Sequence, residues 1–216
     1  MYRLKAYRAD LHIHTVPSPA DSEFTFSIKK LNEYIEAAHL DCIAITNHNL
    51  FDKAQFIEII RQTKIPVFPG IEIDLESGQI LVIGDGADLD DFDQKCAQIE
   101  FHVYEDGNGA VNVEQLTGFF GDFSKYLLIP HYEKKPAIKE ETLARLSPHV
   151  AAGEVSSPKK FIYCVNRKEA LTPVYFSDCR IDQNLSPFPV RQTYWELSPW
   201  HKYDDTLNTR AWTRAT

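Results

Sequence analysis

Six side chains that can bind metal ions stand where short apolar runs of this 216-residue sequence end. The first two are His12 and His14, in the segment Asp10-Leu-His-Ile-His-Thr. The other four follow later apolar runs and are His48, Glu72, His131 and Asp178. Imidazole and carboxylate groups are the ligands that zinc, manganese and iron take in proteins. The set therefore predicts a metal-dependent hydrolase.

Alternating strand and helix patterns place these residues. We expect strands at residues 8–14, 41–46, 67–73, 79–83, 126–130, 150–155 and 173–176. Helices are expected at residues 28–39, 51–62, 88–99, 113–123, 139–146 and 158–169. Repeated strand and helix units predict an α/β fold with a parallel sheet or barrel. The carboxyl ends of parallel strands open onto one face, so distant residues can meet there.

The pair of histidines in the first strand is the sharpest local signal. Side chains alternate along a strand, so Asp10, His12 and His14 are expected on one face, with Leu11 and Ile13 on the other. Two imidazoles with this spacing can bind one ion or two neighbouring ions.

Each of the later residues also has an ordinary structural explanation. His48 could cap a turn, and His131 could be packed in the core. Glu72 could pair with a basic residue, and Asp178 could begin a helix. These explanations leave the shared position at strand ends unexplained, and that position favours a common site.

Composition limits the classes of protein and partner. The chain has 31 acidic and 23 basic residues and a net charge of −8, which argues against a generally basic surface for nucleic acid. Bound cations could still make one pocket locally positive. The four cysteines form no CxxC pair and the chain starts without a secretory leader, so we expect reduced thiols and a cytoplasmic protein. No apolar run approaches the roughly 20 residues that span a bilayer, so no membrane partner is expected.

The regular alternation of strand and helix patterns ends near residue 183. Residues 1–183 read as one catalytic domain, and residues 184–216 as an irregular extension that contains Trp195, Trp200 and Trp212. The extension could bind a protein partner, or it could be what is left of a longer ancestral chain.

In chain order, the motifs resemble those of the PHP (polymerase and histidinol phosphatase) superfamily. The matching segments are Asp10-Leu-His-Ile-His-Thr, Ile45-Thr-Asn-His-Asn, Gly70-Ile-Glu-Ile, Pro130-His and Ser177-Asp, and they run from about residue 8 to residue 182. The resemblance implies a distorted (β/α)7 TIM-like barrel with the site at the C-terminal ends of the strands. It also implies two or three divalent ions, Zn, Mn or Fe, and phosphoester hydrolysis by a metal-activated water.

The resemblance further implies a role for each residue. One ion would be held by His12, His14, Glu72 and Asp178. Glu72 would bridge to a second ion that His131 also binds. A third would involve His48 and Asp21.

Departures from the family pattern lie at three positions. Asn47 stands where the family has Asp, Gln79 stands where a histidine is common, and Arg180 replaces a final histidine. Arginine has no lone pair for a metal, so Arg180 could clamp a phosphate, or it could pair with Asp182. His102 could substitute for the histidine that is missing at Gln79, although a structural role fits it better.

We therefore expect a phosphatase or phosphodiesterase that acts on a nucleotide, a nucleic-acid end or a small metabolite. His48 and Arg180 are the candidate catalytic residues, and Lys134, Lys135 or Lys159 could neutralise substrate charge. Two alternatives stay open. One is a degenerate PHP domain with a structural or regulatory role, and the other is metal-dependent hydrolysis of a different bond.

Overall fold

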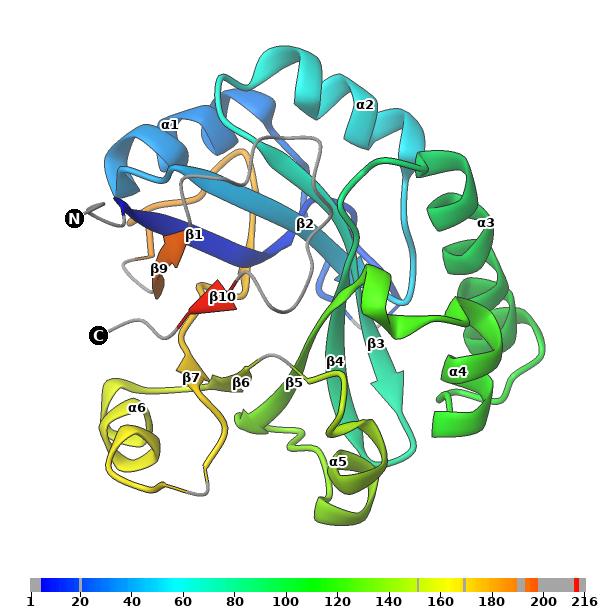
Figure 1. The fold of residues 1–216 in the computed structure, drawn as a ribbon. Helices are drawn as coiled ribbons and strands as arrows, with labels where there is room; N and C mark the ends of the chain where they lie inside the picture. The colour runs from blue at the N-terminus through cyan, green and yellow to red at the C-terminus, as the bar shows by residue number, and fades with distance from the viewer. Residues whose placement is uncertain are drawn as a thin grey trace.

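One curled sheet of ten strands organises the computed structural model, which describes residues 5–19, 21–150, 152–168, 170–189, 193–197 and 212–213 (Figure 1). The strands are β1 (Lys5–His14), β2 (Cys42–His48), β3 (Val67–Leu75), β4 (Gly78–Ile83), β5 (Leu127–Glu133), β6 (Gly153–Val155), β7 (Pro173–Val174), β8 (Cys179–Arg180), β9 (Thr193–Leu197) and β10 (Trp212–Thr213). Their order across the sheet is β10-β9-β1-β2-β3-β4-β5-β6-β7, and β8 pairs with β1.

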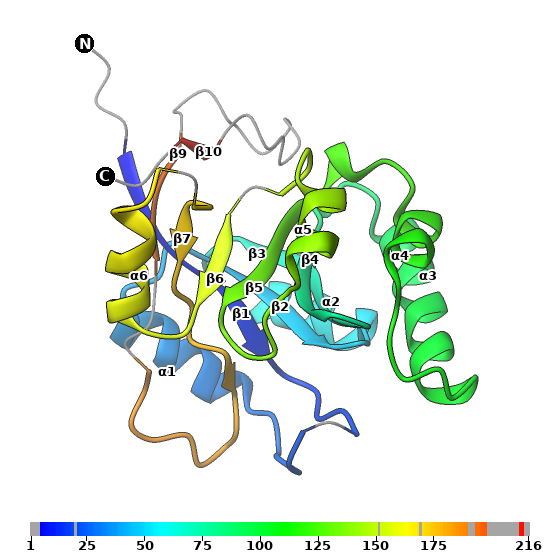
Figure 2. The same cartoon turned by 90° about the horizontal axis from the view of Figure 1, so that it is seen from below.

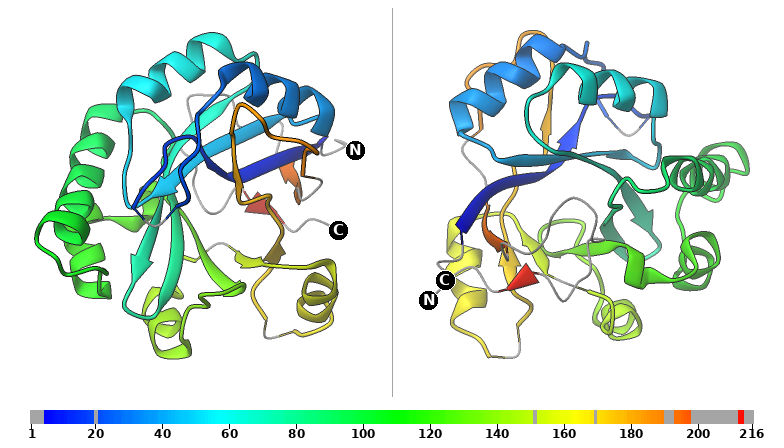
Figure 3. Two further views of the ribbon diagram at one scale, coloured as in Figure 1. Left: turned by 180° about the vertical axis from the view of Figure 1, so that it is seen from behind. Right: turned by 45° about the horizontal axis from the view of Figure 1, so that its top comes forward.

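Helices lie around the outside of this sheet in Figures 1 and 3. They are α1 (Ile28–Ala38), α2 (Lys53–Gln62), α3 (Leu89–Glu100), α4 (Val113–Phe120), α5 (Glu140–Leu146) and α6 (Pro158–Val165). Side chains of Ser27, Asp52 and Asn112 cap the first turns of α1, α2 and α4 by accepting from backbone N–H groups. A π-helical turn (Phe101–Glu105) follows α3, and a 3-10 turn (Phe123–Lys125) follows α4.

Strand directions give the predicted α/β fold, a distorted TIM-like barrel, with a reversal at β4 between two groups of parallel strands. The strands β1, β2 and β3 pair in parallel, and so do β5, β6 and β7, which lie side by side next to α6 in Figure 2. Between these two groups, β4 runs antiparallel to both β3 and β5. The end of β3 and the start of β4 are therefore on the same side of the sheet as the end of β5.

Among the residues that the structure describes, two apolar clusters hold the sheet in place. The larger lies between the strands and the outer helices and contains Leu31, Phe56, Phe92 and Phe120, all buried. The smaller cluster contains Leu11, Ala44, Leu81, Ile129 and Phe176. Full burial of a large apolar side chain contributes about 1.5–3 kcal/mol, so these clusters dominate the stability of the fold.

A β-bulge in β1 overturns the predicted alternation of side chains. Asp10 pairs with Ile43 and Ile13 with Ile45, so three steps along β1 match two along β2. As a result, Asp10 does not share a face with the two histidines. Its carboxylate contacts Tyr34 of α1, on the side where Ile13 is also buried.

The predicted C-terminal extension contributes two strands to the sheet. The strand β9 pairs antiparallel with β1, and β10 pairs with β9. Trp200 and the side chains of Trp195 and Trp212 lie outside the described residues. Within the described ranges, every helix is too short or too polar to cross a bilayer.

Candidate metal centre

The register of the sheet brings the strand-end residues together. His48 on β2 is the direct partner of Glu72 on β3, and His14 on β1 is the partner of Arg180 on β8. Across β5 and β6, the partners are His131 and Glu154. These pairings gather the predicted metal ligands in one place, where three groups of side chains have ligand atoms within 4.8 Å of one another.

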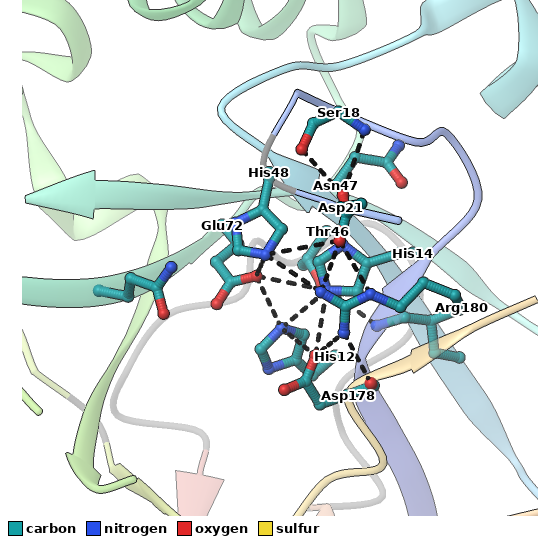
Figure 4. A network of polar contacts seen from close by, with 12 residues as sticks. His12, His14, Ser18, Asp21, Thr46, Asn47, His48, Glu72, Asp178 and Arg180 are labelled. Atoms are coloured by element: carbon teal, nitrogen blue, oxygen red, sulfur yellow. Dashed lines mark hydrogen bonds and ion pairs between the residues drawn. The ribbon is translucent and has the colours of Figure 1, made fainter. Parts of the chain in front are cut away.

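The first ligand group consists of His12, His14, Glu72 and Asp178 (Figure 4). His12 Nε2 lies 3.1 Å from His14 Nε2, 3.0 Å from Glu72 Oε2 and 3.4 Å from Asp178 Oδ1. His14 Nε2 lies 3.3 Å from Glu72 Oε2 and 3.2 Å from Asp178 Oδ1. Four ligands in a tetrahedron around zinc, with bonds of about 2.0–2.1 Å, lie about 3.3–3.4 Å apart. The group therefore has both the chemistry and the spacing of a tetrahedral metal site.

The second ligand group consists of His12, His131 and Glu154, so it shares His12 with the first group and also meets it at Glu72. His131 Nε2 lies 3.1 Å from Glu72 Oε1 and 3.2 Å from Glu154 Oε2. Both ring nitrogens of His131 are buried without a hydrogen bond. Nε2 nevertheless faces the two carboxylate oxygens, so a cation bound there would lie against all three atoms. Because Glu72 turns one oxygen to each group, it is placed to bridge two ions.

Glu154 is the ligand candidate that the sequence analysis missed. It is the middle residue of the short strand β6 and lies inside the strand expected at residues 150–155, so the strand-end criterion did not mark it. Its Oε2 lies 2.9 Å from His12 Nδ1, and its Oε1 lies 2.9 Å from Lys134 Nζ. When His12 Nε2 serves as a ligand, Nδ1 carries the proton and donates to Glu154, which fixes the ring orientation.

The third ligand group consists of His14, Asp21 and His48, and Arg180 lies against it. Asp21 Oδ1 accepts from Nε and Nη2 of Arg180 at 2.9 Å and 2.6 Å. Arg180 Nη2 is also 3.2 Å from His48 Nε2. The expected pairing of Arg180 with Asp182 is wrong, because Asp182 accepts from the backbone N–H of Thr25 and Arg180 pairs with Asp21 and Asp178 instead.

Asn47 and Gln79, the other two departures from the family pattern, lie outside the three ligand groups. Asn47 is buried and accepts from the backbone N–H of Thr15 at 2.6 Å, so it anchors the segment after β1. Gln79 donates to Asp74 at 2.6 Å. His102 contacts the carbonyl oxygen of Ala110 and has the structural role that the sequence favoured.

Asp10 holds the backbone segments that carry the first ligand group. Its Oδ2 accepts from the Tyr34 hydroxyl at 2.5 Å, and its Oδ1 accepts from the backbone N–H of Ser177 at 3.1 Å. Burial raises the pKa of Asp10 to about 6 against the opposing effect of these hydrogen bonds. Asp10 therefore links β1 and α1 to the segment that carries Asp178.

Buried carboxylates make the centre strongly attractive to cations. Burial alone would raise the pKa values of Glu72, Glu154 and Asp178, but His12 and neighbouring donors hold all three well below their ordinary values. Burial would lower the pKa of His12, yet Glu154, Glu72 and Asp178 raise it to about 10. Burial keeps the pKa of His48 below its ordinary value, which favours a neutral imidazole. The centre thus requires positive charge, which a metal ion can supply.

Comparison with known proteins gives the same family. The model of the PHP domain matches residues 10–168. PsfC from Pseudomonas syringae PB-5123 has 18% identity and a TM-score of 0.58, with 96% of this chain and 88% of that chain covered. Endonuclease Q, in complex with a 27-mer duplex that carries an abasic lesion at the active site, has 11% identity, a TM-score of 0.56 and coverage of 96% and 56%.

A two-domain protein from Bacteroides vulgatus ATCC 8482, described as containing a PHP-like metal-dependent phosphoesterase, has 16% identity and a TM-score of 0.50, with coverage of 82% and 53%. This chain therefore spans about half the length of that protein and of endonuclease Q. At these identities the solved structures show a shared fold and nothing more. A comparison with curated proteins gave no match. Because the family model covers most of the sequence, the chain belongs to the PHP domain family.

Proposed function

We propose that this chain is a metal-dependent phosphoesterase that uses a pair of divalent ions, Zn, Mn or Fe. The observation that carries the proposal is the position of Glu72, which is 1% exposed and faces the first group through Oε2 and the second through Oε1. When bound, a pair of such ions supplies a hydroxide near neutral pH and neutralises charge on the phosphoryl group.

Ligand roles follow from the contacts. His12, His14 and Asp178 would hold the first ion, His131 and Glu154 would hold the second, and Glu72 would contribute one oxygen to each. The imidazole of His48, kept neutral by burial, lies with Nε2 3.1 Å from Glu72 Oε2. For it to accept a proton at that nitrogen, the contact with Arg180 Nη2 at 3.2 Å would have to break.

Lys134 supplies fixed positive charge next to both ion positions. It is only 8% exposed, and its Nζ lies 2.9 Å from Glu154 Oε1 and 2.9 Å from Asp178 Oδ2. These carboxylates raise the pKa of Lys134 although burial opposes them, so the ammonium group stays charged. It keeps Glu154 and Asp178 ionised and adds to the attraction for a substrate phosphate.

The net charge of the chain and one of the solved structures that share its fold suggest which phosphate esters to test as substrates. A net charge of −8 disfavours wide contact with a nucleic-acid backbone, so we expect a nucleotide, a nucleic-acid end or a small phosphate ester. The endonuclease Q structure contains duplex DNA with an abasic lesion at its active site, which makes phosphodiesters a substrate class to test.

Turnover of two generic esters tests the proposal. Purified protein loaded with Zn, Mn or Fe(II) is assayed with p-nitrophenyl phosphate and with bis(p-nitrophenyl) phosphate. We expect turnover that EDTA abolishes, and that is lost in His12→Ala and Asp178→Ala variants purified in the same way. These variants exclude a contaminating phosphatase.

A degenerate, non-catalytic PHP domain is the second candidate, and the engagement of Arg180 with the third ligand group favours it. Full metal loading without turnover of either ester would support this alternative over the phosphoesterase.

A further inference from the structure

We infer that the guanidinium group of Arg180 is a built-in cation of the third ligand group, so that this chain binds two divalent ions and excludes a third. The inference rests on the metal centre of the proposed function and concerns how many ions that centre accepts. The third ligand group, His14, Asp21 and His48, otherwise has the composition of a metal site.

Atoms of Arg180 occupy the space that an ion would need. A zinc or manganese ion would lie about 2 Å from the Asp21 oxygen and the His48 nitrogen. Arg180 Nη2 already lies 2.6 Å from Asp21 Oδ1 and 3.2 Å from His48 Nε2 (Figure 4). An ion and this nitrogen cannot both fit between the two ligand atoms.

All donors of Arg180 are engaged within the protein. A guanidinium group has five N–H donors, one on Nε and two on each terminal nitrogen. Nε and Nη2 both donate to Asp21, Nη2 also points to His48, and Nη1 lies 2.6 Å from Asp178 Oδ1 and 3.0 Å from the Asp178 carbonyl oxygen. The phosphate clamp expected from the sequence would need one of these contacts to break. The arrangement instead fits a structural cation.

Both sides of this interaction are held in place. Asp21 Oδ2 accepts from the backbone N–H and the hydroxyl of Ser18 at 3.2 Å and 2.8 Å. Arg180 is fixed in β8 by its pairing with His14. Asp178, which accepts from the same guanidinium group, has a φ of 52°. This value lies in the left-handed region that non-glycine residues rarely adopt. Release of Arg180 would therefore disturb the loop after β1 as well as Asp178.

Metal stoichiometry tests the inference without an activity assay. Wild-type protein is dialysed against excess Zn or Mn, and metal per chain is measured by inductively coupled plasma mass spectrometry. The expected ratio is two. In Arg180→His, an imidazole completes the third ligand group, and the expected ratio rises to three. In the double variant Arg180→His with Asp21→Asn, the ratio should return to two.

Arg145→His is the matched control, because Arg145 is half exposed and pairs with Glu114 on the surface. It should keep a ratio of two. Circular dichroism establishes that each variant is folded. If Arg180→His does not fold, anomalous scattering from wild-type crystals soaked in excess Mn still decides the matter.

A third ion between Asp21 and His48 in wild-type crystals, or a folded Arg180→His variant that still binds two ions, would overturn the inference. Two ions without phosphoester turnover would support this inference and contradict the proposed function. Turnover with three ions in the wild type would do the reverse.

Discussion

His48 and Glu72 are direct partners across β2 and β3, and their side chains meet at 3.1 Å between Nε2 and Oε2. The helix α2 and two loops separate the two residues in sequence, yet the sheet register puts them side by side. His131 and Glu154 are register partners in the same way, and so are His14 and Arg180. Strand register therefore brings these pairs of candidate ligands together.

Glu72→Gln should remove the bridge between the two ions. An amide nitrogen cannot replace a carboxylate oxygen as a ligand, so the metal ratio should fall from two to one or less. Phosphoester turnover should fall by more than the roughly 10- to 100-fold typical of outer ligand partners. Glu76→Gln changes an exposed carboxylate beyond the end of β3 and serves as the control. A Glu72→Gln variant with two tightly held ions would contradict the bridging role.

Glu154→Gln should weaken metal binding without unfolding the protein. The change removes a ligand from the second group and the carboxylate that orients His12 through Nδ1. Metal affinity should fall by more than the roughly 10- to 100-fold typical of outer ligand partners, which titration calorimetry against a competing chelator can measure. Glu133→Gln, on the neighbouring strand β5, should leave affinity unchanged. Equal affinities for wild type and Glu154→Gln would exclude Glu154 from the centre.

Tyr34→Phe should lower stability and keep the metal ratio. The variant removes the 2.5 Å hydrogen bond to Asp10 and leaves a buried carboxylate oxygen short of a donor. The free energy of unfolding should fall by about 1–3 kcal/mol in urea titrations. Tyr163→Phe, at an exposed tyrosine on α6, should have little effect. Unchanged stability in Tyr34→Phe would show that Asp10 does not depend on this contact.

Metal removal should destabilise the whole fold, because the ligands come from strands throughout the sheet. An ion that binds only the folded state stabilises it by about 2.7 kcal/mol at a concentration 100 times its dissociation constant. EDTA should therefore lower the thermal midpoint, and excess Zn or Mn should restore it. A midpoint that does not respond to metal would argue against a folded-state metal centre.

Sequence alone predicted the helices, most strands and the convergence of His12, Glu72, His131 and Asp178. The signal for each of these residues is local, because an apolar run followed by a possible ligand marks the end of a strand. Their convergence follows from the α/β fold, in which the carboxyl ends of parallel strands open onto one face. The roles of these residues in binding metal remain a prediction. Glu154 escaped notice because β6 has only three residues, and the expected strand placed Glu154 inside its range.

Other features depend on tertiary contacts that the sequence does not display. The bulge in β1 comes from a mismatch with β2, and simple alternation therefore put Asp10 on the wrong face. The direction of the Arg180 side chain depends on the pairing of β8 with β1 and on Asp21, which is far away in sequence. The reversal of β4 is likewise visible only once its neighbours are known.

Anomalous scattering from crystals of this protein grown with zinc would show directly whether ions bind at the metal centre. We expect two peaks with the Glu72 carboxylate between them, one against His12, His14 and Asp178 and the other against His131 and Glu154. A map with no peak at this end of the sheet, or with an ion that Glu72 does not contact, would contradict this expectation.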